Sequence, residues 1–467
     1  MKFTFNKQFM VLMFLLLNCF AGYAANEDLI TKQITLKLTE AGTLPDAIGS
    51  SKKYLVTNLK IIGEINGTDL RFIREMAGCD VKGYRISGNL SVLDLSEARF
   101  VAGGDSYYDA IGCYTSNDIM GKYAFCGCRS LKSVNIPSSV TEIGDLAFRD
   151  CSSLTSVNIP SSVTEIGVGA FKKCSSLTSI NIPSSVTVIE SGAFRDCSSL
   201  TNVKIPSSVT EIGVGAFEKC SSLTSVNIPS SVTEIGYEAF SGCSSLTSVN
   251  IPSSVTRIGY AAFSGCSSLT SVNIPSSVTS IEESTFSGCS SLTSVNIPSS
   301  VTYIGDGVFS GCSSLINVNI PSSVTRIGGG AFFGCSSLTS VNIPSSVTSI
   351  GEWAFDDCRG LRSVYVYAET APAGIGRAFE QRHGLYLENC TLYVPKGTYD
   401  AYCWLSELEC FGNIVEFDAT NIRNIVAEPE VQKSARYAVN GQRLTAPVKG
   451  INLVKYNNGR VKKEIVK

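Results

Sequence analysis

The chain has 467 residues, a formal net charge of −2 at pH 7 and 17% charged residues. So little charge, nearly balanced in sign, argues against broad electrostatic binding of nucleic acid. The single histidine, His383, excludes most metal sites and most nucleophilic mechanisms that depend on histidine.

The N-terminal stretch has the pattern of an export signal. Lys2 and Lys7 precede a mostly apolar run over residues 9–20, which is too short to span a bilayer. Gly22 and Ala24 supply the small residues of a cleavage site. We therefore expect a signal peptide over residues 1–24 and a mature protein exported to the cell surface or the extracellular space. A lipid anchor on Cys19 or a buried N-terminal helix fits the same residues less well. No later segment is apolar enough to predict a membrane span.

Residues 25–127 predict an N-terminal cap region with at least one degenerate repeat, because the regular pattern begins only after them. Within it, residues 101–123 are rich in Gly, Tyr and Asp. Their aspartates lack the ligand order of an EF-hand loop, so we predict a polar loop there and no calcium site.

A 23-residue repeat dominates the centre of the chain. Cysteine recurs at every 23rd position from Cys128 to Cys358, and ten full units fill residues 128–357. A typical unit reads CSSLTSVNIPSSVTEIGVGAFKK. A fixed period of this length is the sequence signature of a solenoid.

The apolar positions of one unit predict its local structure. In the second unit, Leu154, Val157 and Ile159 follow the L-x-x-L-x-L spacing of a leucine-rich-repeat strand, and the last two alternate with polar residues. Pro160 removes a backbone donor and ends that strand. Residues 163–166 predict a second short extended segment, and the Ala-Phe pair that follows predicts a helical or 3₁₀ turn.

One unit cannot bury its apolar face alone, whereas stacked coils bury a continuous column of Leu, Val, Ile, Phe and Cys. We therefore predict a β-dominated α/β solenoid: a right-handed leucine-rich-repeat superhelix of 23-residue units with N- and C-terminal caps. The eleven cysteines of the column are expected to be buried free thiols, because stacking does not by itself give disulfide geometry. Among the cap cysteines, proximity alone makes Cys113–Cys126 and Cys403–Cys410 candidate pairs.

The repeat resembles the BspA-type leucine-rich repeats of bacterial surface proteins. The resemblance is carried by the LTSVNIP strand, the VTEIG segment and the GAFxxC turn, as in residues 223–229, 232–236 and 239–243. It extends to segments similar to that family's N-terminal cap and closing segment, at residues 59–69, 90–95 and 392–402. This resemblance implies surface display and adhesion to host proteins or neighbouring cells, and it does not imply catalysis.

The C-terminal part divides into two predicted regions. Residues 358–420 read as a degenerate repeat and a C-terminal cap, and residues 421–467 form a basic, β-rich tail with a hairpin turn at Asn458-Gly459. The stretches GQRL, KGINLVK and KKEIVK make the tail similar to the C-terminal sorting domains of type IX secretion cargo. A small β accessory without a sorting role is the alternative.

The outward strand positions of the units hardly vary and form a ladder of asparagines. The ladder consists of Asn158, Asn181, Asn227, Asn250, Asn273, Asn296, Asn319 and Asn342. Stacked amides can hydrogen-bond to one another and so stabilise the array. They can equally contact a sugar or an extended peptide. Both interpretations stay open on the sequence alone.

The later units differ from the earlier ones by their aromatic residues. These are Tyr237, Tyr260, Tyr303, Phe333 and Trp353. Exposed aromatics are enriched at interfaces, although scattered surface aromatics without a role are also common. We take these five residues as candidate partner-binding residues, together with the asparagines of the same units: Asn250, Asn273, Asn296, Asn319 and Asn342.

No motif predicts chemistry. The chain lacks a G-x-S-x-G elbow, a G-x-x-x-x-G-K-[ST] loop and an H-E-x-x-H pair. We therefore predict no catalytic residue, metal or cofactor. The predicted function is that of an exported, non-catalytic surface protein that binds a protein or glycan of a host or neighbouring cell through its solenoid. The alternative is a structural spacer or a self-associating component of the cell surface.

Overall fold

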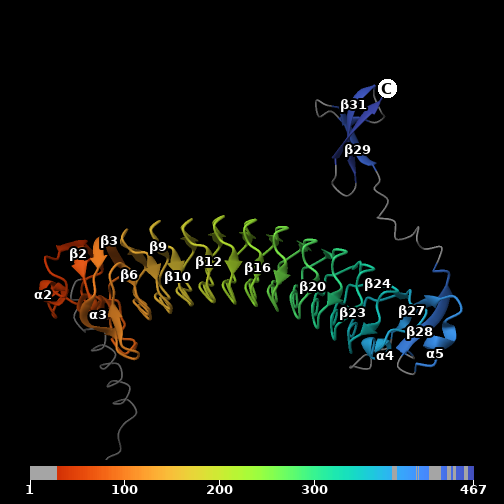
Figure 1. Cartoon of the computed structure of the whole chain (residues 1–467), viewed down its shortest axis with the longest axis horizontal. Coiled ribbons are helices and arrows are strands. Elements are labelled where there is room, and N and C mark those ends of the chain that lie inside the picture. The colour runs from red at the N-terminus through yellow and green to blue at the C-terminus, as the bar shows by residue number, and fades with distance from the viewer. Residues whose placement is uncertain are drawn as a thin grey trace, which may run out of the picture.

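The computed structural model describes residues 29–380, 387–405, 408, 410–419, 433–438, 443–444, 449–456 and 461–466. The predicted signal peptide, His383 and the turn at Asn458-Gly459 lie outside the described residues. Figure 1 shows the repeats as a curved row of coils between an N-terminal and a C-terminal cap. The predicted β-dominated solenoid of 23-residue units is confirmed.

Nine of the ten coils between residues 128 and 357 contribute two short strands; the coil of residues 312–334 contributes a second strand, and Asn319 forms single bridges in place of its first strand. The first strands are β7 (Ser133–Asn135), β9 (Ser156–Asn158), β11 (Ser179–Asn181), β13 (Asn202–Lys204), β15 (Ser225–Asn227), β17 (Ser248–Asn250), β19 (Ser271–Asn273), β21 (Ser294–Asn296), β24 (Ser340–Ile343) and β26 (Ser363–Val366). The second strands are β8 (Glu142–Ile143), β10 (Glu165–Ile166), β12 (Val188–Ile189), β14 (Glu211–Ile212), β16 (Glu234–Ile235), β18 (Arg257–Ile258), β20 (Ser280–Ile281), β22 (Tyr303–Ile304), β23 (Arg326–Ile327) and β25 (Ser349–Ile350).

Strands of successive coils pair in parallel and in register, so that each residue lies beside its equivalent 23 positions away. Val226 of β15, for example, pairs with Val249 of β17. The valine points into the core while its Ser and Asn neighbours point outward. Exact register follows from the repeat, because a slip by one residue would turn the apolar positions to the solvent.

The N-terminal cap continues the sheet of first strands. Its elements are β1 (Ile34–Lys37), α2 (Leu44–Ile48), β2 (Asn58–Ile65), α3 (Gly67–Met76), β3 (Val92–Phe100), β4 (Gly103–Tyr108), β5 (Cys113–Thr115) and β6 (Ile119–Met120). The sheet order is β1-β2-β3-β7-β9. The fully buried Arg74 of α3 holds the helix to the segment that leads into the first coil, since it donates hydrogen bonds to the carbonyls of Tyr123 and Ala124 at 2.7 and 3.1 Å.

The C-terminal cap closes the other end, and the tail forms a sheet of its own. The cap consists of α4 (Ile375–Ala378), β27 (Leu387–Pro395), α5 (Tyr399–Cys403) and β28 (Phe411–Phe417), with the sheet order β24-β26-β27-β28. The tail strands are β29 (Lys433–Ala438), β30 (Arg443–Leu444), β31 (Gly450–Tyr456) and β32 (Val461–Val466), in the antiparallel order β30-β29-β31-β32.

The third side of each coil, here called the turn segment, leads from the second strand to the cysteine. The expected helical or 3₁₀ turn is not formed there. The bond from Lys172 N to Gly169 O spans three residues at 2.9 Å, but Gly169 and Lys173 have φ of +60° and +62°. Left-handed residues cannot continue a right-handed helix, so the segment is a succession of separate turns.

The turn segments hold neighbouring coils together. The N–H of Phe148 donates to the carbonyl of Ala170 in the next coil at 2.7 Å, and that of Phe171 donates to Ala193 at 2.8 Å. The rings follow the same spacing, with centroids 5.1 Å apart for Phe148 and Phe171. This stack of rings runs without interruption from Phe125 to Phe379.

The pairing of second strands, in contrast, stops at two places. In eight units a glycine follows the isoleucine of this strand; its N–H bonds to the preceding coil, as from Gly236 N to Ile212 O at 2.8 Å. A Cβ on Gly236 would lie 2.6 Å from the carbonyl carbon of Gly213, so the approach requires glycine. In two units this glycine is replaced by Glu190 and Glu282, and the sheet ends before each of these coils.

A pair of adjacent glycines tests this requirement. A Cβ on Gly328 would lie 2.5 Å from Asp306 N, whereas one on Gly329 would meet nothing closer than the Glu352 carbonyl at 3.4 Å. Gly328→Ala should therefore lower the free energy of unfolding by about 1–3 kcal/mol, the usual cost of forcing extra volume into a packed site. Gly329→Ala, the matched control, should leave it unchanged or slightly raised. Denaturant unfolding followed by circular dichroism measures both; equal effects would contradict this account.

The repeat cysteines are free, as predicted, and each has a hydrogen-bonding role. The thiol of Cys174 donates to the carbonyl of Phe148 at 3.1 Å, and the same bond recurs at 3.0–3.3 Å in all coils from Cys151 to Cys358. Burial raises the pKa of Cys197, Cys243 and Cys289 to about 12. The column is thus made of neutral thiols that tie each coil to the one before.

The disulfides suggested for the caps are wrong, because all four cysteines are free. Cys113 hydrogen-bonds to Tyr107, whereas Cys126 is buried near Cys79 and Arg74. Cys403 donates to the carbonyl of Asp400 in its own helix at 3.8 Å. Nearness in sequence did not bring the sulfur atoms together.

The raised thiol pKa values predict loss of stability in alkali. An unfolded chain ionises its thiols above pH 9.0, while the folded column keeps them neutral up to about pH 12. Rising pH therefore favours the unfolded state, and the free energy of unfolding should fall across this window by up to about 1.4 kcal/mol per pH unit for each thiol. A pH titration at fixed denaturant concentration, followed by circular dichroism, measures the slope.

A variant with Cys197→Ser, Cys243→Ser and Cys289→Ser is the control, because serine does not ionise in this window and should give a shallower slope. Iodoacetamide at pH 8 should leave the repeat thiols of the folded wild-type chain unmodified. Their rapid alkylation under these conditions would contradict burial of the column.

Candidate binding surfaces of the solenoid and its N-terminal cap

The asparagine ladder lies on the outward face of the first strands. Asn273 pairs in register with Asn296, and single bridges continue the ladder through Asn319 to Asn342. The side chains of Asn250, Asn273, Asn296 and Asn319 are exposed, and Asn342 is half-buried. Among the described residues, one amide–amide hydrogen bond joins the ladder, from Asn296 Nδ2 to Asn273 Oδ1 at 3.5 Å. Most of these amides are therefore available to a ligand.

Hydroxyl groups, not amides, carry most of the side-chain bonding between coils. Thr247 Oγ1 donates to the Thr224 carbonyl at 3.2 Å, and Ser254 Oγ donates to the Val232 carbonyl at 2.7 Å. Equivalent bonds recur along the array on both strands. The sequence analysis missed this role, although the invariance of Ser and Thr at these positions is its signal.

A second surface, here called the tyrosine–arginine patch, is formed by Glu234, Tyr237, Arg257, Tyr260, Tyr303 and Arg326. The Arg257 guanidinium lies 5.2 Å from the Tyr237 ring centroid, hydrogen-bonds to its hydroxyl and pairs with Glu234 at 2.8 Å. The rings of Tyr237 and Tyr260 lie 5.1 Å apart. The patch therefore has an ordered core of two rings and one guanidinium.

The same surface continues over the following coils. Arg326 lies 5.4 Å from the centroid of the Tyr303 ring, so the arrangement of arginine over tyrosine is repeated. Partial burial and the charge of Asp306 raise the pKa of Tyr303, which keeps its hydroxyl neutral. Tyr260 is 44% exposed. The patch thus offers aromatic faces, neutral phenols and cations to the solvent.

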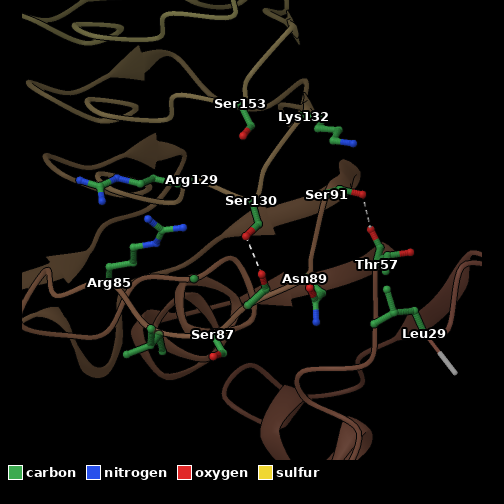
Figure 2. Close-up of a pocket in the computed structure, with 13 residues that line it drawn as sticks. Leu29, Thr57, Arg85, Ser87, Asn89, Ser91, Arg129, Ser130, Lys132 and Ser153 are labelled. Carbon is green, nitrogen blue, oxygen red and sulfur yellow. Dashed lines mark hydrogen bonds between the residues drawn. The ribbon is translucent and has the colours of Figure 1, made fainter. Parts of the chain in front are cut away.

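The N-terminal cap carries a hollow of about 970 Å³ beside the first coils. Figure 2 shows the side chains that line it, with Arg85 and Arg129 on one side and Lys132 on the other. A neighbouring hollow of about 720 Å³ continues along the turn segments and shares Arg85 and Arg129. These cations were not predicted from the sequence. The signal that could have revealed them is in the first unit, which reads CRSLKS and so carries Arg129 and Lys132 where the next unit reads CSSLTS.

Neither a metal centre nor a membrane helix is found in the described ranges. No three side chains of His, Cys, Asp or Glu gather there in a way that could hold a metal ion. No helix in the same ranges combines the length and the apolar character needed to cross a membrane.

The family follows from comparison with known repeat patterns. The pattern described as "BspA type Leucine rich repeat region" matches residues 118–247 and 233–362, which together make up more than half of the chain. The chain belongs to the BspA-type leucine-rich-repeat family. Proteins of this family are typical of bacterial surfaces and are not known as enzymes. None of the curated proteins matches the chain.

Solved structures of bacterial leucine-rich-repeat proteins are similar to this BspA-type chain. One, from Bacteroides ovatus, is 28% identical, with 65% of this chain and 88% of that chain covered and a TM-score of 0.46. A leucine rich cell surface protein from Faecalibacterium prausnitzii is 33% identical, with 67% and 86% covered and a TM-score of 0.43. The pneumococcal vaccine antigen PcpA is 18% identical, with 62% and 80% covered and a TM-score of 0.45.

Two candidate residues of the BspA-type array lie apart from the tyrosine–arginine patch. Tyr303 lies on a second strand and Tyr237 and Tyr260 stand two residues after theirs, whereas Trp353 and Phe333 lie further along the turn segments. Trp353 has φ of +56° at the position that Gly330 occupies in the preceding coil. Left-handed φ recurs at this coil position along the array, including at the non-glycine residues Leu146, Glu238, Ala261 and Ser284, so the conformation belongs to the repeat.

The contact between Tyr237 and Arg257 follows from the repeat itself, although the sequence analysis did not draw it. Tyr237 stands three residues after Glu234, and Arg257 stands 23 residues after Glu234 in the next coil. In-register stacking therefore places the arginine beside the tyrosine's turn. The sequence analysis considered Arg257 among the second-strand positions and Tyr237 among the variable aromatic residues, so their contact was not predicted.

The two interpretations of the asparagine ladder predict different stabilities. Replacing Asn227, Asn250, Asn273 and Asn296 together by serine should lower the free energy of unfolding by less than about 1 kcal/mol, because one long amide bond is lost. Replacing Ser231, Ser254, Ser277 and Ser300 by alanine should cost several times more, since each hydroxyl bonds to the preceding coil. Denaturant unfolding measures both variants. A loss of several kcal/mol in the asparagine variant would establish the ladder as a stabilising element.

Proposed function

We propose that this chain is an exported, non-catalytic bacterial surface protein that binds a protein or glycan of a host or neighbouring cell through its solenoid. The tyrosine–arginine patch is the observation that carries the proposal. It concentrates aromatic rings and guanidinium groups, with the Glu234 carboxylate, on four of the five coils between residues 220 and 334, which are otherwise nearly identical. In these units, variation falls mostly on solvent-facing side chains, while the buried Leu, Val, Ile, Phe and Cys positions are constant; the buried alanine is the exception, replaced by Thr285 and Val308.

The chemistry of the patch favours recognition. Tyrosine and arginine are enriched among the residues that dominate binding energies, and a tyrosine ring supplies a large contact area at little conformational cost. Arg257 is held in place by Glu234 and Tyr237, so its guanidinium is ordered before any partner arrives. Preorganisation of this kind lowers the entropic cost of association.

The asparagine ladder supports an extended partner. Its amides repeat in register along the first strands and carry donors and acceptors on one exposed face. A sugar chain or an extended peptide presents groups at a regular spacing that such a ladder can meet. Aromatic rings near the same coils would add stacking contacts to these hydrogen bonds.

Export and surface placement complete the proposal. They are supported by the signal pattern of residues 1–24, by the typical location of the BspA-type family and by the tail. The tail strands form a four-stranded antiparallel sheet, which is compatible with a sorting domain and equally with a small β accessory. If the chain is still exported after deletion of residues 421–467, the tail is not the sorting signal.

The binding proposal predicts a specific loss in a tyrosine variant. Tyr237→Ala, Tyr260→Ala and Tyr303→Ala should together weaken binding by at least about tenfold, because truncating hot-spot residues costs more than about 1.4 kcal/mol. Arrays of host matrix proteins, glycans and whole cells identify the ligand with the full chain, and biolayer interferometry measures the change.

Val168→Ala with Val214→Ala is the matched control, since both valines are exposed at the coil position of Tyr237 in earlier units. This variant should bind as the wild type does. A chain that binds nothing in the arrays, yet associates with itself in light scattering, would overturn the proposal in favour of the self-associating spacer.

A further inference from the structure

We propose that the hollow in the N-terminal cap is a second binding site, which takes the sulfate or carboxylate groups of an acidic oligosaccharide. Its cationic walls are formed by Arg85, Arg129 and Lys132 (Figure 2). These residues come from two structural units. Arg85 belongs to the loop between α3 and β3, and the other two belong to the first repeat. The site lies outside the tyrosine–arginine patch and shares no residue with it.

The three exposed cations that line the hollow are not neutralised by carboxylates in the part of the protein that the structure describes. Within the described ranges, the guanidinium groups of Arg85 and Arg129 and the ammonium group of Lys132 take part in no ion pair and no side-chain hydrogen bond. Neighbouring cations of the same region are paired, as Arg99 is with Asp118 at 2.9 Å and Lys122 with Asp145 at 2.7 Å. Placing like charges around one hollow without a carboxylate costs electrostatic energy, which a bound anion would recover.

The remaining polar groups of the hollow favour an acceptor-rich ligand. Ser130 Oγ donates to Gly88 O at 2.6 Å and Ser91 Oγ donates to Thr57 O at 3.1 Å, so these hydroxyls serve the protein. Ser87 and Ser153 also line the hollow and keep their hydroxyls for a ligand. Together with the three cations they present mainly donors, which match the oxygen atoms of an acidic sugar.

The shape of the site favours an oligosaccharide over a single inorganic anion or an acidic peptide. A hollow of about 970 Å³ has the size of a small-molecule site. The adjoining hollow of about 720 Å³ extends it past Arg85 and Arg129, and there Asp150 and Asp196 stand among Lys173 and Lys219. Leu29 and Ile86 are the large apolar side chains among its lining residues, and no aromatic lines it. The lining of the larger hollow is mostly polar along its length, so a chain that carries hydroxyl groups as well as acidic groups can use more of its hydrogen-bonding groups than an inorganic anion or a hexaglutamate peptide can.

The loop that carries Arg85 is held firmly in place. A Cβ on Gly88 would lie 2.5 Å from the Cα of Gly78, so the loop packs closely against the end of α3. The bond from Ser130 to Gly88 fastens the same loop to the first coil. The arginines are thus mounted on rigid backbone, and binding need not order the loop.

Calorimetry on the full chain tests the proposal with four probes: a heparin-derived hexasaccharide, a hexagalacturonate, neutral cellohexaose and a hexaglutamate peptide. At least one of the two acidic oligosaccharides should bind, and their comparison tells sulfate from carboxylate. Arg85→Ala combined with Arg129→Ala should weaken that binding by at least about tenfold. Higher salt should weaken it as well.

Lys204→Ala is the matched control, because Lys204 is an exposed cation on a first strand and lines neither hollow. This variant and the tyrosine variant should both retain full affinity, which separates this site from the proposed solenoid function. Binding of neither acidic oligosaccharide, equal binding of cellohexaose, equal or tighter binding of hexaglutamate, or unchanged affinity in the double arginine variant would overturn the proposal.

Discussion

The structure depends on the backbone hydrogen bonds that join the turn segments of successive coils. The repeat phenylalanines donate their N–H groups to the next coil, their rings stack on the next ring, and their carbonyls accept the thiol of the cysteine 26 residues further on. These three interactions repeat through the whole array, whereas both strand ladders are interrupted. An unpaired backbone group in this dry column would cost several kcal/mol, so the turn segment fixes the spacing that the strands then follow.

This constraint separates the residues that build the array from those that can recognise a partner. A side chain in the column meets its own copy in the next coil, and any change there is felt by both neighbours. Strand-edge and turn positions such as those of Tyr237 and Arg257 face solvent and tolerate change. The caps are freer still, because they stack on one side only, and the cationic hollow lies there. Surface chemistry is therefore concentrated where stacking does not dictate the residue.

The sequence predicted what the period controls and missed what depends on exact backbone geometry. The strands, the register and the buried thiols follow from apolar positions that recur every 23 residues. The turn segment was predicted as helical because an Ala-Phe pair does not reveal left-handed residues such as Lys173. The sequence shows Glu190 and Glu282 where other units have glycine. That these positions end the ladder of second strands could be recognised only once the structure showed how closely the backbones approach at the glycines. The hollow at Arg85 joins segments that no period relates, and only the folded cap brings them together.

The two glutamates have a mechanical consequence. Before the Glu190 coil neither strand ladder continues, and the backbone bonds that cross the junction are those of the turn segment, at Gly169, Phe171 and Lys173. A tensile load along the array is carried there by fewer bonds in parallel than at other junctions. If the array is stretched, its coils are expected to separate first at this junction, and each unfolded coil lengthens the chain by roughly 75 Å. The array therefore has its weakest junction before the Glu190 coil, where both strand ladders are interrupted.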